Sequence, residues 1–184
     1  LMPMKCIQID RVYRAERPQK GRLREFIQCD IDIIGSESSD SELELILTTV
    51  KALKAIGLSD FTVKINDRRL LTNVLTKLGF DRDLDSVCIS FDKMDKIGLD
   101  GVCAELSEKE FSAEAVENFR EFLSRDSITL DYLGELLTEE DAEPVESLKN
   151  IIAMCNELSD NSFNIEFDLS LVRGQGYYTG TVFE

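Results

Sequence analysis

The sequence contains no histidine among its 184 residues. This absence excludes Ser–His and Cys–His activation of a nucleophile as well as histidine-ligated metal sites, and it removes the commonest general base in enzymes. Any catalysis by this chain must therefore work by positioning and electrostatics, as group transfer from nucleotide phosphates can.

Long apolar runs and paired cysteines are lacking too. No stretch approaches the roughly 20 apolar residues of a membrane span, and no signal peptide with a charged start and an apolar core is present. The cysteines are odd in number and none forms a CxxC pair. We interpret them as buried free thiols of a cytoplasmic protein, in preference to disulfides or zinc ligands. They are Cys6, Cys29, Cys88, Cys103 and Cys155.

Positive charge is scarce as well. Lys and Arg number 21 against 36 Asp and Glu, for a net charge of −15, although 43% hydrophobic and 31% charged residues are ordinary for a globular protein. Such acidity argues against indiscriminate nucleic-acid binding, but it leaves room for a local basic surface that meets one RNA end. The chain opens directly into a predicted strand and stops inside another, so we expect it to be part of a larger protein.

The scarce cations gather in one hairpin. Residues 5–14 and 25–34 are predicted strands, and the loop between them, residues 16–24, is longer than a turn requires. Such a loop could clamp phosphate oxygens with guanidinium groups, although a solvated basic loop remains the alternative. The charged side chains concerned are Arg14, Glu16, Arg17, Lys20, Arg22 and Arg24.

The returning strand of this hairpin, residues 25–34, alternates in polarity. One face is apolar (Ile27, Cys29, Ile31 and Ile33) and is predicted to belong to a core. The opposite face carries a ring, an amide and two carboxylates. It is either a solvent-exposed strand face or the floor of a ligand site, where the ring could stack on a base. Its members are Phe26, Gln28, Asp30 and Asp32.

Helices and short strands follow. A helix is predicted to begin at a capping box of Ser39 and Glu42 and to end at Gly57. Thereafter the pattern predicts a strand, a helix closed by a glycine, a helical insertion, a long helix begun by a proline, and an alternating strand. These elements are residues 61–65, residues 68–78 before Gly79, residues 80–141, the helix at Pro144, and residues 163–171.

The last segment, LVRGQGYYTGTVFE, places an arginine at the end of an apolar strand beside glycines and two tyrosines. Glycines of this kind suit a backbone that approaches a ligand closely. Earlier in the chain, Asn66-Asp67-Arg68-Arg69 is interpreted as a helix cap, with the alternative that its arginines reach phosphate. The acidic runs at residues 100–121 and 135–146 are interpreted as solvated helix faces.

Two of these segments carry a family resemblance. YRAERPQKGRLREFIQCDIDIIG resembles the second signature motif of class II aminoacyl-tRNA synthetases in its histidine-specific form, and DLSLVRGQGYYTGTVFE resembles the histidine-binding signature of the histidyl-tRNA synthetases. The resemblance implies an α+β fold, with a mainly antiparallel sheet core, flanking helices and a small helical insertion. It divides the chain into residues 1–79 and 142–184 of a catalytic core and an insertion at 80–141.

The resemblance also implies ATP, histidine and tRNA(His) as substrates, with Mg²⁺ held mainly by the ATP phosphates. Arg14 and Arg173 would be the catalytic cations near the α-phosphate, and both would contact histidine. Glu16, Arg22 and Phe26 would complete the ATP site. Gln28, Asp32, Tyr177 and Tyr178 would contact histidine, and Arg17 and Gln19 would meet the tRNA acceptor end.

Departures from the family pattern bear on these roles. Gln175-Gly176 stands where the family commonly has Leu-Asp, and Asp32 often corresponds to Glu in bacterial members. The first and third class motifs, one histidine-binding loop and the anticodon-binding domain are expected outside these residues. The chain alone is thus expected to be inactive, and the full-length protein to be a homodimer. The rivals are a histidine-sensing regulatory subunit of ATP phosphoribosyltransferase, disfavoured by the retained Arg14, Arg22 and Arg173, and a structural acidic scaffold.

Overall fold

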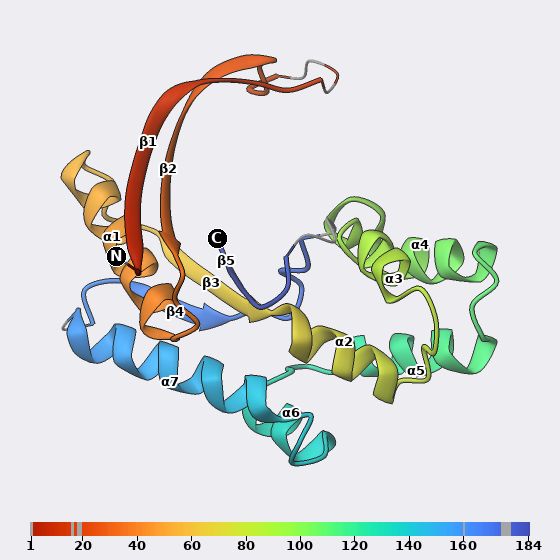
Figure 1. Cartoon of the computed structure of the whole chain (residues 1–184). Helices are drawn as coiled ribbons and strands as arrows, with labels where there is room; N and C mark the ends of the chain where they lie inside the picture. Colours follow the sequence, from red (N-terminus) through yellow and green to blue (C-terminus); the bar gives the residue numbers. More distant parts are fainter. Residues whose placement is uncertain (1, 16, 18–19, 160, 174–177) are drawn as a thin grey trace. The chain divides into compact units, whose positions relative to one another are not determined.

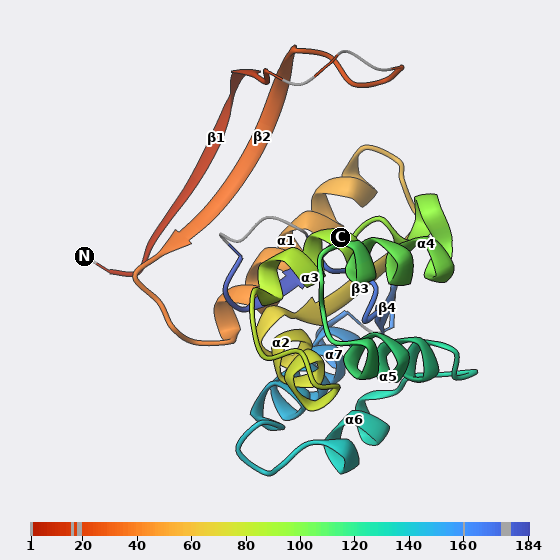
Figure 2. The same cartoon turned by 90° about the vertical axis from the view of Figure 1, so that its right-hand side faces the viewer.

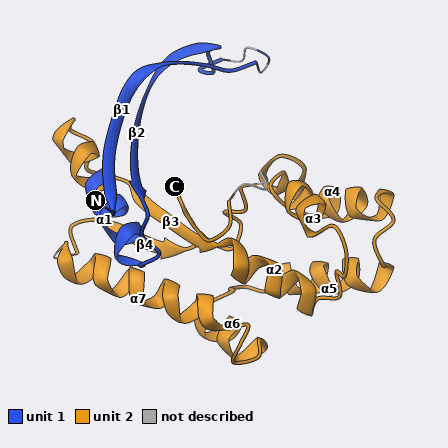
Figure 3. Ribbon diagram, viewed as in Figure 1, with its two compact units in different colours: residues 1–49 blue, residues 50–184 orange. Residues whose placement is uncertain are grey.

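The computed structural model describes residues 2–15, 17, 20–159, 161–173 and 178–184. The chain divides into two compact units, residues 1–49 and residues 50–184, coloured separately in Figure 3.

The first unit is built on the predicted hairpin. Strands β1 (Met4–Tyr13) and β2 (Glu25–Ile34) pair antiparallel along their whole length (Figure 1). Immediately beyond the last pair, the backbone N–H of Arg14 donates to the carbonyl of Arg24 at 2.8 Å. This bond closes the base of the basic loop, so the loop begins where the sequence predicted.

The prediction that the apolar face of the hairpin belongs to a core is wrong for Ile27 and Cys29, whereas Ile31 and Ile33 are half-buried. Ile27 is 72% exposed, Ile7 is 68% exposed, and Cys29 is exposed as well. Among the residues of this unit that the structure describes, the sheet consists of two strands. A single strand pair buries an apolar face only where a second layer lies over it.

Helix α1 (Asp40–Ala55) follows the hairpin and ends as predicted at Gly57, whose φ of +90° suits the left-handed C-terminal cap. The helix starts directly after Ser39, as predicted, but the side-chain contacts at this end differ from the prediction. Oε2 of Glu42 is buried with no hydrogen-bond partner among the described residues, so this oxygen completes no capping box. Instead, the hydroxyl of Ser38 accepts from the N–H of Asp40 at 3.2 Å.

The second unit holds a three-stranded mixed sheet of order β4-β3-β5, made of β4 (Asn164–Phe167), β3 (Thr62–Asp67) and β5 (Thr181–Phe183). The central strand β3 pairs parallel with β4 and antiparallel with β5. Helix α7 (Glu143–Leu158), with Pro144 in its first turn, packs along β3 and β4 (Figure 2). These elements form one core, in which Ile65 and Leu148 are completely buried.

The remaining helices are α2 (Arg68–Lys77), α3 (Leu84–Phe91), α4 (Met94–Glu108), α5 (Ala113–Leu123) and α6 (Leu130–Leu136). The helical character expected for residues 80–141 is confirmed. Phe119 of α5 makes edge-to-face ring contacts with Phe80 and Phe91. The ring centroids lie 6.0 Å and 5.3 Å from that of Phe119, respectively. Such contacts favour a fixed arrangement of the three rings.

The alternating strand predicted over residues 163–171 is shorter than expected. It ends at Phe167 because Asp168 turns the chain: its carboxylate accepts from both the N–H and the hydroxyl of Ser170, at 2.9 and 2.6 Å. Leu171 then donates its N–H to the carbonyl of Asp168 at 3.1 Å. An Asx-type turn of this kind competes locally with strand pairing.

Candidate functional site

The predicted ligand-facing row of β2 does share one face. Register pairs Phe26 with Val12, Gln28 with Asp10, and Asp32 with Cys6, so side chains of these pairs lie on the same side of the hairpin. The row from Phe26 to Asp32 rises about 20 Å at about 3.3 Å per residue. It therefore suits an extended ligand that is contacted by one side chain after another.

At the loop end of this row, Arg14 covers the ring of Phe26. The guanidinium carbon lies 4.5 Å from the ring centroid, within the range of a cation–π contact. Arg14 is exposed and Phe26 is half-buried. A base can stack on the covered face of the ring only if the guanidinium swings away from it, for example onto a phosphate.

At the α1 end of the row, Asp32 lines a cavity of about 260 Å³ between the hairpin and α1. The thiol of Cys6 lies 3.8 Å from Oδ2 of Asp32. Between the two ends, the amide of Gln28 donates to Asp30 at 2.7 Å, so Asp30 holds the Gln28 side chain in place. Sequence reasoning placed Asp30 on this face but gave it no role.

The basic loop is open to solvent. Arg17, Lys20 and Arg22 are all exposed. Glu16 and Gln19, for which the resemblance implies an adenine contact and a tRNA contact, lie outside the described residues.

Arg173 stands in the second unit with a φ of +48°, in the left-handed region that a non-glycine residue adopts only when its surroundings impose it. Its guanidinium pairs with Glu184 at 3.2 Å. Tyr178 is half-buried, whereas Tyr177 and Gly174-Gln175-Gly176 lie outside the described residues. Because Arg14 belongs to the first unit, its convergence with Arg173 stays a prediction.

The segment leading to Arg173 is tied to the end of β3 by Asn66. This side chain is 1% exposed, and its amide nitrogen donates to the carbonyls of Leu169 and Leu171, each at 3.2 Å. Its oxygen accepts from the N–H of Asp67 at 2.8 Å. Every polar atom of Asn66 is thereby used inside the protein.

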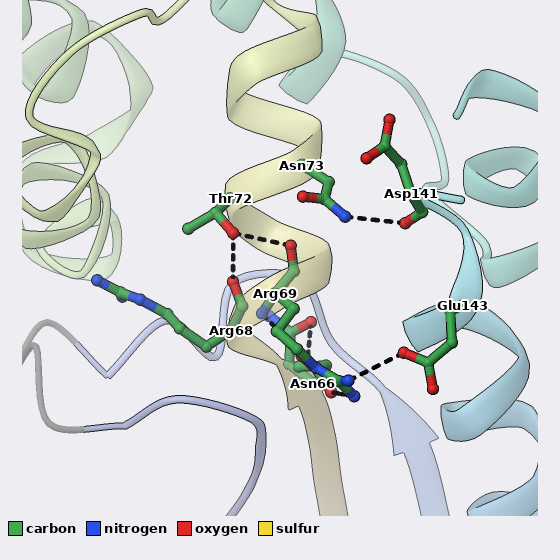
Figure 4. Close-up of polar contacts among 8 residues, drawn as sticks. Asn66, Arg68, Arg69, Thr72, Asn73, Asp141 and Glu143 are labelled. Carbon is green, nitrogen blue, oxygen red and sulfur yellow. Dashed lines mark hydrogen bonds and ion pairs between the residues drawn. The ribbon is translucent and has the colours of Figure 1, made fainter. Parts of the chain in front are cut away.

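The side chains of two neighbouring arginines at the start of α2 point to opposite sides (Figure 4). Arg68, 6% exposed, donates to the carbonyl of Val172 at 3.3 Å and to Asp85 of α3 at 2.6 Å. Arg69 pairs with Asp67 and with Glu143 of α7, each at 2.9 Å. The side chain of Asp67 also accepts from the N–H of Arg69, so the predicted cap is confirmed. The engagement of both guanidinium groups favours capping over phosphate contact.

The turn before Arg173 has an ionic anchor as well. Lys64 pairs with Asp168 at 2.5 Å, and this hydrogen bond raises the pKa of the Lys64 ammonium. Burial opposes ionisation of Asp168, but the hydrogen bonds from Lys64 and Ser170 hold the pKa of its carboxyl below the ordinary value. Both groups are therefore charged at neutral pH.

Sequence reasoning missed the anchoring role of Asn66 and Arg68. A signal was available: a run of polar residues stands directly after an apolar strand, where buried polar side chains must find partners. Their partners in the chain, residues 169–172, come more than a hundred positions later, so local periodicity could not supply them.

All five cysteines are free, as predicted. Burial is confirmed for Cys88, Cys103 and Cys155, and it raises the pKa of the Cys88 and Cys155 thiols to about 11. The prediction of burial is wrong for Cys29, which is exposed, and for Cys6, which is only half-buried.

The residues that the structure describes contain neither a metal-ligating cluster nor a helix that could span a membrane. Over residues 2–15, 17, 20–159, 161–173 and 178–184, no cluster of three or more Cys, Asp or Glu side chains is arranged to ligate a metal ion. Within the same residues, every helix is too short or too polar to reach across a lipid bilayer.

Comparison with curated proteins gives consistent matches. The chain is 42% identical to the histidine–tRNA ligase of Leifsonia xyli over 98% of its own length and 44% of that protein. It is 39% identical to the histidine–tRNA ligase of Aeropyrum pernix, over 100% of the chain and 42% of that protein. The chain therefore spans about two fifths of the length of the relatives it matches.

Solved structures agree on the fold. The crystal structure of histidyl-tRNA synthetase from Nostoc sp. PCC 7120 superposes with a TM-score of 0.83 at 28% identity, over 100% of this chain and 44% of that one. A second match is a Bacillus halodurans protein described as an ATP phosphoribosyltransferase regulatory subunit/histidyl-tRNA synthetase. It superposes with a TM-score of 0.77 at 24% identity, over 100% of this chain and 48% of that one. The latter likeness shows the fold alone. A family model described as Histidyl-tRNA synthetase matches residues 2–184. The chain, with its α+β fold, thus belongs to the histidyl-tRNA synthetase family.

Proposed function

We propose that the full-length protein is a histidine–tRNA ligase. It activates histidine with ATP to give histidyl-adenylate and pyrophosphate, and then transfers the histidyl group to the 3′ end of tRNA(His). The observation that carries this proposal, beside family membership, is the single strand face that presents Phe26, Gln28 and Asp32 in a row, with the Arg14 guanidinium 4.5 Å from the first of them. A cation, a ring, an amide and a carboxylate in this order match the parts of an aminoacyl-adenylate.

Along this row, Phe26 stacks on adenine and Arg14 turns from the ring to the α-phosphate and the histidine carboxylate. Gln28 and Asp32 contact histidine, with the Asp32 carboxylate suited to its ammonium group. The exposed Arg22 reaches the terminal phosphates. Glu16 faces adenine, and Tyr177 and Tyr178 enclose the imidazole.

In the first step, a histidine carboxylate oxygen attacks the α-phosphorus, and the bond from that phosphorus to the pyrophosphate oxygen breaks. Arg14 and Arg173 neutralise the charge that develops on the α-phosphate, so no proton acceptor from a histidine side chain is required. Mg²⁺ would be held mainly by the ATP phosphates and would supply positive charge to the leaving pyrophosphate.

In the second step, the terminal ribose hydroxyl of the tRNA attacks the carbonyl carbon and displaces AMP. Arg17 and Gln19, which stand between the two hairpin strands in the sequence, meet the acceptor end. This local basic surface offsets the overall charge of −15. The full-length protein forms a homodimer through residues outside this chain.

The test is histidine-dependent ATP–pyrophosphate exchange by the full-length protein. Arg173→Ala should lower the exchange rate by roughly 10²–10³-fold, the usual cost of losing one group that stabilises transition-state charge. The matched control is Arg125→Ala, which removes an exposed guanidinium lying 4.8 Å from the ring of Tyr132 in the helical segment and should leave exchange intact.

Full exchange activity in Arg173→Ala would remove that residue from its role. No exchange in the unmutated protein, combined with histidine binding, would favour the histidine-sensing regulatory subunit instead. Retention of Arg14, Arg22 and Arg173 supports the enzyme, since a sensor has no need of cations for ATP.

A further inference from the structure

The chain on either side of residues 174–177 is held by the same short run at the end of β3. On the first side, Asn66 holds the carbonyls of Leu169 and Leu171, each at 3.2 Å. On the second side, the backbone N–H of Arg68 donates to the carbonyl of Gly180 at 2.9 Å. The run from Asn66 to Arg68 thus holds both the stretch that ends at Arg173 and the stretch that contains Gly180.

Of these anchoring contacts, the one made by the side chain of Arg68 is nearest to Arg173 in sequence. Its Nη1 donates to the carbonyl of Val172 at 3.3 Å, and Val172 is itself 1% exposed. The peptide plane of this carbonyl is the one that joins Val172 to Arg173. Its orientation therefore bears directly on the backbone angle of Arg173, which lies at a φ of +48°.

The other arm of the guanidinium is fixed as well. Nη2 of Arg68 pairs with Asp85 of α3 at 2.6 Å, although Asp85 is largely exposed. A guanidinium is planar and rigid, so a partner on each arm determines how the group is turned. Burial of Arg68 to 6% exposure leaves it little room to reorient.

We propose that Arg68 is a positioning residue for the adenylation reaction, acting through the Val172 carbonyl to hold Arg173 in its left-handed conformation. This inference rests on the proposed function, because it takes Arg173 to be the catalytic cation. Arg68 itself touches no substrate. Its guanidinium links Asp85 of α3 to the peptide that joins Val172 to Arg173.

Arg69 provides a matched control within the same turn of α2. It also carries an ion-paired guanidinium, but its partners include Asp67 and Glu143, on the side facing α7 (Figure 4). Since Asp67 is completely buried, Arg69→Met should reduce stability by at least as much as Arg68→Met. The two variants therefore separate loss of stability from loss of position.

The experiment measures kcat and KM for ATP and for histidine in pyrophosphate exchange by the full-length protein, together with the thermal midpoint of each variant. Arg68→Met should lower kcat by about 10–100-fold with little change in either KM, as expected when a catalytic group is misplaced by an ångström or less. Arg69→Met should keep kcat within about threefold. The kcat of Arg68→Lys should lie between those of the two Met variants, because one ammonium group can make only some of the hydrogen bonds of the guanidinium.

Equal kcat values in the Arg68 and Arg69 variants at similar thermal midpoints would overturn the inference. If Arg68→Met does not fold, the comparison of Arg68→Lys with Arg69→Lys decides in the same way. Loss of exchange in Arg173→Ala, with normal kcat in both Arg68 variants, would refute this inference and leave the proposed function standing. No exchange by the unmutated protein would refute both.

Discussion

Replacing Asn66 with Asp exchanges one NH₂ group for an oxygen and changes nothing else in the covalent structure. Asn66 is 1% exposed, and its NH₂ group donates to two backbone carbonyls at 3.2 Å. The remaining oxygen can still accept from the N–H of Asp67. The substitution therefore removes two hydrogen bonds and directs a carboxylate at two carbonyl oxygens.

The loss of stability follows from those contacts. Each buried carbonyl left without its donor costs about 1–3 kcal/mol, so Asn66→Asp should lower the free energy of unfolding by about 2–6 kcal/mol near neutral pH. Asn66→Ala loses the same donors without adding a charge. The two variants should consequently differ in how stability depends on pH.

The sign of this dependence is determined by burial. The introduced carboxyl ionises at about pH 3.9 in the unfolded chain, and burial next to two carbonyl oxygens raises its pKa in the folded state. Below the unfolded value it is protonated in both states and its hydroxyl can donate to one carbonyl. As pH rises toward the folded value, the stability deficit grows by about 1.4 kcal/mol per pH unit.

Urea unfolding at pH 5 and pH 8, monitored by far-ultraviolet circular dichroism, measures this deficit against the unmutated protein. The deficit of Asn66→Asp should be larger at pH 8, whereas that of Asn66→Ala should be the same at both. An Asn66→Asp deficit below about 1 kcal/mol at pH 8, or one independent of pH, would refute the anchoring geometry.

Two further predictions concern the helical segment and the thiols. Glu105 accepts hydrogen bonds from Lys93 and Lys109, which lower the pKa of its carboxyl to about 2. Glu105→Gln should lower the free energy of unfolding by about 1–2 kcal/mol at pH 7. Because the folded pKa is depressed, this advantage of the unmutated protein is present above pH 4.5 and should disappear as urea-unfolding measurements are taken down toward pH 2; an advantage that persists there would contradict the ion pairing. A thiol reagent followed by peptide mapping should label exposed Cys29 rapidly and Cys88, whose pKa burial raises to about 11, only on unfolding; equal rates would show that the burial is wrong.

Local pattern predicted most of the elements correctly. The two strands of the hairpin, the cap at Asp67, the glycine ends of α1 and α2 and the proline start of α7 all depend on residues within a few positions of one another. Period-two alternation likewise placed Phe26, Gln28 and Asp32 on one face. Such features are decided by backbone geometry, which the sequence encodes locally.

The errors have a common cause. Alternation continued to residue 171, but the carboxylate of Asp168 bound Ser170 and ended β4 at Phe167. Alternation also marked Ile27 for a core, yet burial of a strand face requires a second layer, which periodicity cannot reveal. Strand length was thus decided by a side-chain contact and exposure by the lack of a covering layer, and periodicity reveals neither.

By itself, the sequence determined the family, the basic loop, the polar strand face and the absence of histidine chemistry. Only the tertiary structure showed how the peptide before Arg173 is held, because Asn66 and Arg68 meet their carbonyl partners across separations of 103 to 105 residues. Hydrogen bonds over such distances depend on the pairing of β3 with β4 and β5, and that pairing exists only once the chain has folded.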